Sequence, residues 1–267
     1  MHSVTSAPAT EHRTVKAEAI RDFWTERARQ YKTDARATLA DDTVRALEIR
    51  AITKYLHNGA TVLDAGCGNG YSTIQFARRR MLDITGIDYS SEMVRYAREN
   101  LSLLRSDNPT RSKIRFAAGD VMNLSFPRAH FDTVITERCL QNLPSWEDQR
   151  HAILNLAGVL KPQGVLIMAE CSFTGLDQLS RILNALRRPL ADNALPWHNL
   201  FFCDECLIND PAIRKLLAPV CIVNFASSYA VLSRLLPVPF QFVARWLARP
   251  SVGPFSYHKL YLWRRRG

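Results

Sequence analysis

The sequence has no apolar run long enough to cross a membrane and no apolar leader at its start. A bilayer span needs about 18–20 consecutive apolar residues, and no such run occurs in these 267 residues. Residues 1–14 are small and polar, which predicts a disordered tail rather than a secretory signal. We therefore expect a cytoplasmic protein, and peripheral contact with the inner face of a membrane stays open.

The sequence also lacks the pattern of a structural metal site. It holds six cysteines, and without an export signal we expect free thiols. Cys203 and Cys206 have the C-x-x-C spacing, but a structural zinc site needs four ligands and no second C-x-x-C is present. We predict no metal site.

Acidic residues are outnumbered, with 25 Asp and Glu against 35 Lys and Arg, for a formal charge of +10. This excess permits an anionic partner such as nucleic acid, a phosphorylated substrate or a membrane surface, without choosing among them. Basic and aromatic residues interleave only at residues 261–266. That footprint is too small to favour nucleic acid as a partner.

The central feature of the chain is the stretch VLDAGCGNG from Val62 to Gly70, in which an apolar run ends in Asp64 and three glycines alternate. It predicts a buried strand, a tight turn that approaches a ligand, and the start of a helix. The dinucleotide fingerprint G-x-G-x-x-G holds a pyrophosphate, but here the third glycine comes one residue early. A carboxylate at Asp64 suits a cationic ligand better than a pyrophosphate.

Strand and helix patterns alternate around this turn. The predicted strands are residues 61–64, 83–88, 113–117, 131–136 and 164–170, with helices at 71–80, 91–104 and 146–160 between them. Two helices precede them, from residue 15 and after Asp41-Asp42, and an antiparallel pair, 220–225 and 257–263, follows. We predict an α/β fold with a doubly wound, mostly parallel seven-stranded sheet and helices on both faces.

This pattern predicts a single domain at residues 15–267, because the chain is short for two full domains. Its parts are N-terminal helices at 15–57, a ligand-binding core at 58–170, and inserts at 171–219 and 227–256 that form a helical lid. One helix is expected around residues 204–217.

Acids follow successive strands of the predicted sheet, whose ligands lie beyond the strands' carboxyl ends. Asp88 ends the second strand, where an acid can accept both ribose hydroxyls, and Asp120 follows the third strand, where it can accept from an adenine amino group. Met93 supplies an apolar side chain for the adenine ring. A single Asp at a strand end is more often a cap or turn residue, but Asp64, Asp88 and Asp120 together indicate one ligand site.

On these residues, from about Tyr31 to Glu170, the chain resembles the class I S-adenosylmethionine (SAM)-dependent methyltransferases of the small-molecule type. The resemblance implies SAM as cofactor and S-adenosyl-L-homocysteine as product. It places Gly66, Gly68 and Gly70 against the methionine part, Asp64 on its amino group, Asp88 and Tyr89 at the ribose, and Met93, Asp120 and Val121 around adenine. Tyr31 resembles the aromatic segment that closes over SAM. Gln163 departs from the family's turn before the fifth strand, where glycine is commoner.

Candidates for the acceptor side follow the fourth and fifth strands. Glu137 could orient the acceptor or touch the methionine end of the cofactor, Arg138 could meet a substrate anion, and Glu170 ends the fifth strand near the same crevice. A salt-bridged Glu137–Arg138 pair is the structural alternative.

The sequence Pro-Trp-His-Asn adds Trp197, His198 and Asn199 to these candidates. A loop histidine with a near-neutral pKa can act as a general base. We take Glu137 and His198 as catalytic candidates, and Arg138, Glu170, Trp197 and Asn199 as substrate-binding ones. A surface histidine without that role stays open for His198.

The family's Asn-Pro-Pro-Tyr type of tetrapeptide, used on nucleobase or amide nitrogens, is absent, and residues 136–139 read Thr-Glu-Arg-Cys. Inserts rich in Trp, Phe and Leu predict a lid over a small acceptor that is partly apolar or anionic. The leading hypothesis is O-methylation of a sugar, glycolipid or secondary metabolite. The alternatives are RNA or protein methylation through the basic surface, or a noncatalytic SAM-binding or membrane-peripheral module.

Overall fold

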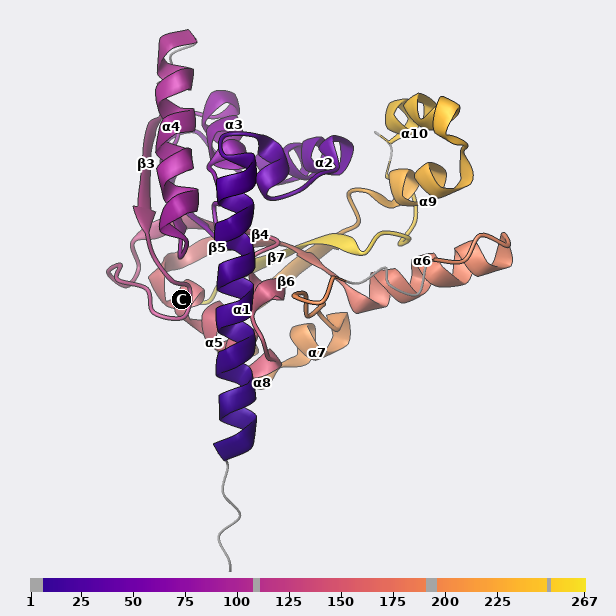
Figure 1. The fold of residues 1–267 in the computed structure, drawn as a ribbon. Coiled ribbons are helices and arrows are strands. Elements are labelled where there is room, and N and C mark those ends of the chain that lie inside the picture. The colour runs from indigo at the N-terminus through magenta and orange to yellow at the C-terminus, as the bar shows by residue number, and fades with distance from the viewer. Residues whose placement is uncertain (1–6, 108–110, 191–195, 249–250) are drawn as a thin grey trace, which may run out of the picture.

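A seven-stranded sheet organises the chain, and the computed structural model describes residues 7–107, 111–190, 196–248 and 251–267. The strand order is β3-β2-β1-β4-β5-β7-β6 (Figure 1). The strands are β1 (Thr61–Ala65), β2 (Asp83–Asp88), β3 (Lys113–Ala118), β4 (Phe131–Glu137), β5 (Leu160–Cys171), β6 (Leu217–Val223) and β7 (His258–Arg265). β1 to β5 are parallel, and β7 is antiparallel to both β5 and β6. The predicted fold class and its antiparallel end are confirmed.

Helices cover both faces of this sheet. They are α1 (Ala7–Tyr31), α2 (Asp42–Thr53), α3 (Tyr71–Arg79), α4 (Ser91–Asp107), α5 (Trp146–Val159), α6 (Phe173–Ala185), α7 (Asp204–Asn209), α8 (Pro211–Leu216), α9 (Ser227–Leu235) and α10 (Gln241–Leu247), with short 3-10 turns η1 (Ala35–Ala37), η2 (Leu140–Asn142) and η3 (Val238–Phe240). One core lies between the sheet and α2, α3 and α4, with Ile52, Phe76 and Val94 buried in it. The other contains Ile153 and Leu156 of α5. Because both faces are covered, the central strands are apolar on both sides.

The N-terminal helix begins earlier than the sequence predicts. Residues 7–14 belong to α1 instead of a disordered tail, while residues 1–6 lie outside the described part of the chain. Pro8 is the second helical residue, where its missing N–H costs nothing. Arg13 lies 3.6 Å from Asp148 of α5, so the first turns of α1 are attached to the body of the domain.

The predicted helix at residues 204–217 is wrong as a single element, because it is two helices. Pro211 cannot donate an N–H to continue α7, and a new helix begins there. Asp210 caps it, since its Oδ1 accepts hydrogen bonds from the backbone N–H groups of Ala212 and Ile213, both at 2.9 Å. β5 likewise begins at Leu160, and the predicted turn at residues 161–164 is an irregularity in its pairing with β4. Gln163 has a left-handed φ of 65° there.

The helices α6, α9 and α10, which follow β5 in the sequence, form an outer helical layer (Figure 1). A small apolar cluster joins α6 to α9 through Leu179, Leu183 and Ala230, with Tyr257 packed against it. Asp41, the N-cap of α2, accepts a hydrogen bond from the hydroxyl of Tyr229 at 3.0 Å. None of the described helices is long and apolar enough to span a bilayer. The division of the chain into core and lid inserts stays a prediction.

Candidate functional site

The glycine turn after β1 is held in a narrow space. The N–H groups of Gly66 and Cys67 both donate to the carbonyl of Ile87, at 2.8 and 2.9 Å, and Gly66 and Gly68 have φ of 79° and 53°. A Cβ on Gly66 would lie 2.5 Å from Sγ of Cys139, and a Cβ on Gly68 would overlap Thr38. Both positions therefore require glycine for conformation and for space.

Gly70 has a packing role in addition to the cofactor contact that the resemblance implies. It is the N-cap of α3 with a φ of 75°, and a Cβ there would lie 2.6 Å from Cζ of Phe116 and 2.9 Å from Cβ of Ala97. It does not line the cavities next to the turn. Gly70 thus allows the start of α3 to pack closely on α4 and β3, and the cofactor contact assigned to it stays a prediction.

Two buried acids, Asp64 and Glu137, lie at the ends of the neighbouring strands β1 and β4. Oδ2 of Asp64 accepts from the hydroxyl of Thr73, while Oδ1 of Asp64 and Oε2 of Glu137 have no hydrogen-bond partner among the described residues. Burial raises the pKa of Asp64 to about 7, and burial followed by the charge of Asp64 raises the pKa of Glu137 well above its usual range. Such a pair can be neutralised by a cation.

Asp88 ties the glycine turn to the end of β2. Its Oδ2 accepts from the N–H of Gly68 at 3.0 Å and its Oδ1 from the N–H of Ser90 at 2.9 Å. Burial raises the pKa of Asp88 to about 6. Each carboxylate oxygen has a second lone pair free for a ligand hydroxyl. A small cavity of about 60 Å³ is lined by Asp88, Met93 and Glu137 with Gly66 and Gly68, so the structure brings these predicted residues together.

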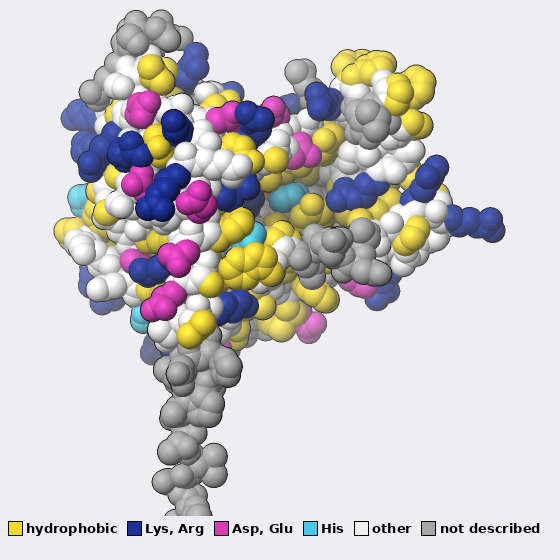
Figure 2. Space-filling view, in the orientation of Figure 1, with side chains coloured by type: hydrophobic (Ala, Val, Ile, Leu, Met, Phe, Trp, Pro, Cys, Tyr) yellow, Lys and Arg dark blue, Asp and Glu magenta, His cyan; other side chains and the backbone are white. Residues whose placement is uncertain are grey.

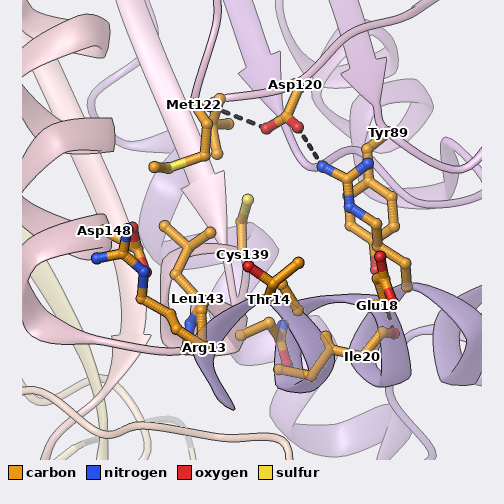
Figure 3. A pocket seen from close by; sticks show the side chains of 15 residues that line it. Arg13, Thr14, Glu18, Ile20, Tyr89, Asp120, Met122, Cys139, Leu143 and Asp148 are labelled. Atoms are coloured by element: carbon orange, nitrogen blue, oxygen red, sulfur yellow. Dashed lines mark hydrogen bonds and ion pairs between the residues drawn. The ribbon is translucent and has the colours of Figure 1, made fainter. Parts of the chain in front are cut away.

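A larger cavity of about 340 Å³ continues from the small one, with Tyr89, Cys139 and Asn142 shared between them. Figure 3 shows α1 passing along one side of it, with Tyr89 and Asp120 on the other. Val121 lines it as predicted. Asp120 forms an ion pair with Arg21 of α1, and its Oδ1 accepts from the N–H of Met122 at 2.9 Å (Figure 3). The acid expected at an adenine amino group is thus already engaged by α1.

A third cavity, of about 280 Å³, lies on the other side of the small one, with Trp24, Thr38 and Arg138 lining both. We call it the acceptor cavity. Its lining residues include the aromatic rings of Phe23, Trp24, Phe201 and Tyr257, the polar Gln141 and Asn199, and two histidines, His198 and His258. The three cavities therefore form a continuous series, ordered from Asp120 through the glycine turn to His198.

His198 is placed in this cavity by stacking. Its ring lies 4.4 Å from that of Phe23, nearly parallel at 29°, and its Nδ1 has no hydrogen-bond partner among the described residues. Burial and the charge of Arg27 lower its pKa, so the ring is neutral at pH 7 and can accept a proton. His258 also lines the cavity, but burial lowers its pKa to about 3 and its Nδ1 lies 3.7 Å from Sγ of Cys171.

Two predicted substrate contacts are held by the protein itself. Arg138 forms a buried ion pair with Glu48 of α2, while its Nε has no hydrogen-bond partner among the described residues and its side chain lines the small and acceptor cavities, so its substrate role stays a prediction. Glu170 is buried and lines none of the three cavities. Its carboxylate accepts from the hydroxyl of Thr136 at 2.8 Å and from the N–H groups of residues 139–141 at 3.1–3.2 Å. Glu170 therefore shapes the loop after β4 and does not contact the acceptor.

Tyr31 and Trp197 do not line any of the three cavities, although the ring of Trp197 packs edge-on against Phe23 and His198, which do. Tyr31 packs with Met93 in a small cluster, and the guanidinium of Arg27 lies 4.6 Å from its ring centre. Trp197 is 57% exposed, while its neighbours His198 and Asn199 line the acceptor cavity. Trp24, two turns before Tyr31 on α1, is the aromatic residue beside the glycine turn.

Sequence reasoning misses Phe23, Trp24, Tyr257 and His258 as lining residues. Phe23 and Trp24 follow the apolar stripe of a helix, which indicates a core face, and no local signal separates a core face from a cavity wall. Tyr257 and His258 lie more than a hundred residues from β4 in the sequence, and only the antiparallel pairing of β7 with β5 brings them to the cavity.

The donor set fits SAM, the cofactor that the resemblance implies. Glu137, which has one unpaired carboxylate oxygen among the described residues, lines the small cavity, and Asp64 ends the neighbouring strand, so the two acids offer negative charge for an amino group. Asp88 stands where ribose hydroxyls can reach it, and the 340 Å³ cavity is of the size that small-ligand sites have. No group of His, Cys, Asp and Glu that could hold a metal occurs among the described residues.

Comparison with known proteins gives one consistent grouping. A family model described as a methyltransferase domain matches residues 56–210. The 27-O-demethylrifamycin SV methyltransferase of Amycolatopsis mediterranei is 32% identical over 155 residues, which cover 58% of this chain and 54% of that protein. The demethylmenaquinone methyltransferase of Desulfitobacterium hafniense is 33% identical over 125 residues, 45% of this chain and 47% of that protein. The chain spans about half the length of these curated relatives.

Among solved structures, the [4+2]-cyclase SpnF shares the fold. The superposition has a TM-score of 0.54 at 20% identity and covers 83% of this chain and 80% of that one. This likeness concerns the fold alone.

Proposed function

The chain belongs to the methyltransferase domain family, and from this premise we propose that it transfers the methyl group of SAM to a hydroxyl of a small, partly apolar molecule. One observation carries the proposal. The acceptor cavity joins the small cavity beside the glycine turn, and a neutral histidine with an unpaired ring nitrogen lines it. The amino group, ribose and adenine of SAM would lie at Glu137, Asp88 and the cavity beside Tyr89.

SAM, when bound, supplies a methyl group attached to its sulfonium sulfur. After transfer of that methyl group, the remaining S-adenosyl-L-homocysteine is a neutral thioether. Most of the protein's task is then to hold the acceptor in line, which can contribute up to about 7–11 kcal/mol. The Trp24 side chain lines both cavities, so it can fix the acceptor where the two meet. A hydroxyl must also lose its proton, and His198 is the group in the acceptor cavity that can accept it at neutral pH. A general base of this kind contributes about 10²–10⁴ in rate.

The walls of the acceptor cavity favour an acceptor whose hydroxyl is attached to an apolar or aromatic skeleton, rather than a bare sugar. Phe23, Trp24, Phe201 and Tyr257 offer ring faces, and apolar rings pack against each other with favourable offset or edge geometry. A secondary metabolite or a lipid-like phenol fits such walls. The name of the Amycolatopsis relative, which specifies O-methylation of a demethylrifamycin, is consistent with that acceptor class.

Calorimetry with SAM and S-adenosyl-L-homocysteine tests the site. We expect binding in the micromolar range, lost in Asp88→Ala because this carboxylate faces the ribose and also holds the N–H of Gly68. Asp83→Ala is the matched control, since Asp83 lies at the opposite end of the same strand and pairs with Arg115 at the surface. Unchanged binding in Asp88→Ala refutes the site.

Turnover tests the reaction itself, because the fold of SpnF carries a different named activity. Purified protein is incubated with SAM and a panel of phenols, hydroquinones, lipids and sugar nucleotides, with both the methylated product and S-adenosyl-L-homocysteine measured. We expect equal amounts of the two with a hydroxylated aromatic or lipid-like acceptor. Binding of SAM without transfer to any hydroxyl in the panel argues for a noncatalytic SAM-binding protein.

A further inference from the structure

The part of the chain beyond the family match has an unusual charge. The match ends at residue 210, and Asp210 is also the last acidic residue of the sequence. From Pro211 to Gly267 every charged side chain is Lys or Arg. The charge excess of the whole chain is therefore concentrated in the segment that forms β6, α9, α10 and β7.

This segment also exposes a group of large apolar side chains. Phe240, Phe242, Trp246, Leu247 and Val252 are 52%, 66%, 77%, 36% and 69% exposed. We call these five residues the apolar tip. Figure 2 shows hydrophobic side chains gathered over α10, with Lys and Arg side chains nearby over the outer end of α6. Exposed aromatic side chains in one contiguous patch indicate an interaction surface.

The tip is held in this orientation by the opposite side of the same helix. Phe242 and Trp246 lie one turn apart on the outer side of α10, and Ala244 and Ala248 are buried on its inner side. The hydroxyl of Tyr229 on α9 donates to Asp41 at 3.0 Å, and this hydrogen bond anchors α9, which packs on α10, to the N-terminus of α2. The exposed face is therefore a fixed surface and not a fraying helix end.

The tip is directly connected to the acceptor cavity. The chain runs from α10 through residues 251–257 into β7, and Tyr257 and His258, at the end of that path, line the cavity. Tyr257 also packs on the cluster that joins α6 to α9. A partner that contacts the apolar tip would therefore be close to residues 251–257, whose last residue, Tyr257, lines the acceptor cavity together with His258.

We propose that the apolar tip inserts into the surface of an anionic lipid membrane, with the basic side chains around it facing lipid headgroups. Trp and Phe are the side chains that favour the boundary between headgroups and acyl chains. Arg245 lies between Phe242 and Trp246 on α10 and is exposed. Arg187 and Arg188 add exposed positive charge after α6, while Arg181 on α6 is paired with Asp177. The residues from Pro211 onward add no acid that would repel an anionic surface.

Vesicle flotation tests the proposal with the full-length protein. Vesicles of phosphatidylcholine containing phosphatidylglycerol should carry the protein upward, vesicles of phosphatidylcholine alone should carry much less, and raising the salt concentration should weaken the association. The double variant Phe242→Ser/Trp246→Ser should lower the partition coefficient by at least about tenfold. Leu103→Ser is the matched control, since Leu103 is 53% exposed on α4, on the other side of the molecule (Figure 1), and it should float like the unchanged protein.

Three results overturn the proposal. In the first, the unchanged protein does not bind anionic vesicles. In the second, the double variant floats as well as the unchanged protein. In the third, light scattering shows that the unchanged protein is a dimer and that the double variant is a monomer. The last result assigns the tip to a second copy of this chain. Calorimetric binding of SAM, measured for each variant, reports that the protein is folded and separates this proposal from the proposed function, because neither tip residue lines the cofactor cavities.

Discussion

The guanidinium of Arg138 forms its buried ion pair with Glu48 of α2, although Glu137 is its neighbour in the sequence. The left-handed backbone of Arg138, with a φ of 51°, turns the two consecutive side chains to different surroundings. Arg138 meets α2, and Glu137 faces the glycine turn with one oxygen unpaired among the described residues. A helix outside the matched family region therefore fixes the loop after β4 and leaves Glu137 free for a cation.

Breaking this ion pair should destabilise the fold. Glu48→Gln leaves the buried charge of Arg138 uncompensated, and we expect a loss of about 3–5 kcal/mol in the free energy of unfolding. Denaturant unfolding measures it. Glu92→Gln, which breaks a more exposed pair with Arg95, should cost less than about 1 kcal/mol. The double variant Glu48→Leu/Arg138→Met should recover much of the loss, and a loss for Glu48→Gln as small as for Glu92→Gln contradicts the assignment.

Asp64 should lower the stability of the ligand-free protein at neutral and higher pH. Burial raises its pKa from 3.8 to about 7, so between these values the folded state keeps a proton that the unfolded chain has lost. The free energy of unfolding then falls as pH rises through this range. Asp64→Asn should raise it by about 1–4 kcal/mol at about pH 8, with little gain at about pH 4. Thermal unfolding across pH measures both, and an equal gain at both pH values speaks against the raised pKa.

The affinity for SAM should increase with pH through neutrality. The cationic amino group is attracted by ionised Asp64, and protonation of Asp64, whose pKa is about 7, weakens that attraction as pH falls. Protonation of Asp88, whose pKa is about 6, also removes acceptor capacity from the ribose hydroxyls. Calorimetry between about pH 6 and pH 8 should show stronger binding at the upper end. Asp64→Asn should flatten the profile. Glu137→Gln should weaken binding more than Asp64→Asn, because Glu137 lines the small cavity and Asp64 does not.

His198 should control the chemical step and not cofactor binding. His198→Ala should lower kcat by about 10²–10⁴ with a hydroxyl acceptor, while SAM affinity measured by calorimetry stays unchanged. Because burial and Arg27 lower the pKa of His198, the activity should be full at pH 7 and decline only below the usual range for histidine. The variant should lose that acidic limb. Retention of the same limb in His198→Ala assigns it to another group.

The sequence by itself determined the fold class and the residues that gather around the glycine turn. The apolar strands 61–64 and 83–88, the glycine turn and the acids that follow each strand are local signals, since each residue acts within the element that carries it. Gly66, Gly68, Asp88 and Met93 consequently lie together around one cavity as expected. Even the correct elements did not disclose that Gly70 leaves room for Phe116 of β3 and Ala97 of α4, because this close approach arises between separate elements.

The tertiary structure alone decided the acceptor half. Arg138 is neutralised by Glu48, ninety residues earlier, Glu170 is used by the N–H groups of the loop after β4, and Phe23 and Tyr257 meet across the acceptor cavity from opposite ends of the chain. A charged or aromatic residue looks the same in the sequence whether its side chain interacts with another part of the protein or with a ligand. Only the packing of distant elements determines which of the two it meets, and this is why the ion pairs of Asp120 with Arg21 and of Arg138 with Glu48, and the stacking of His198 on Phe23, needed the fold.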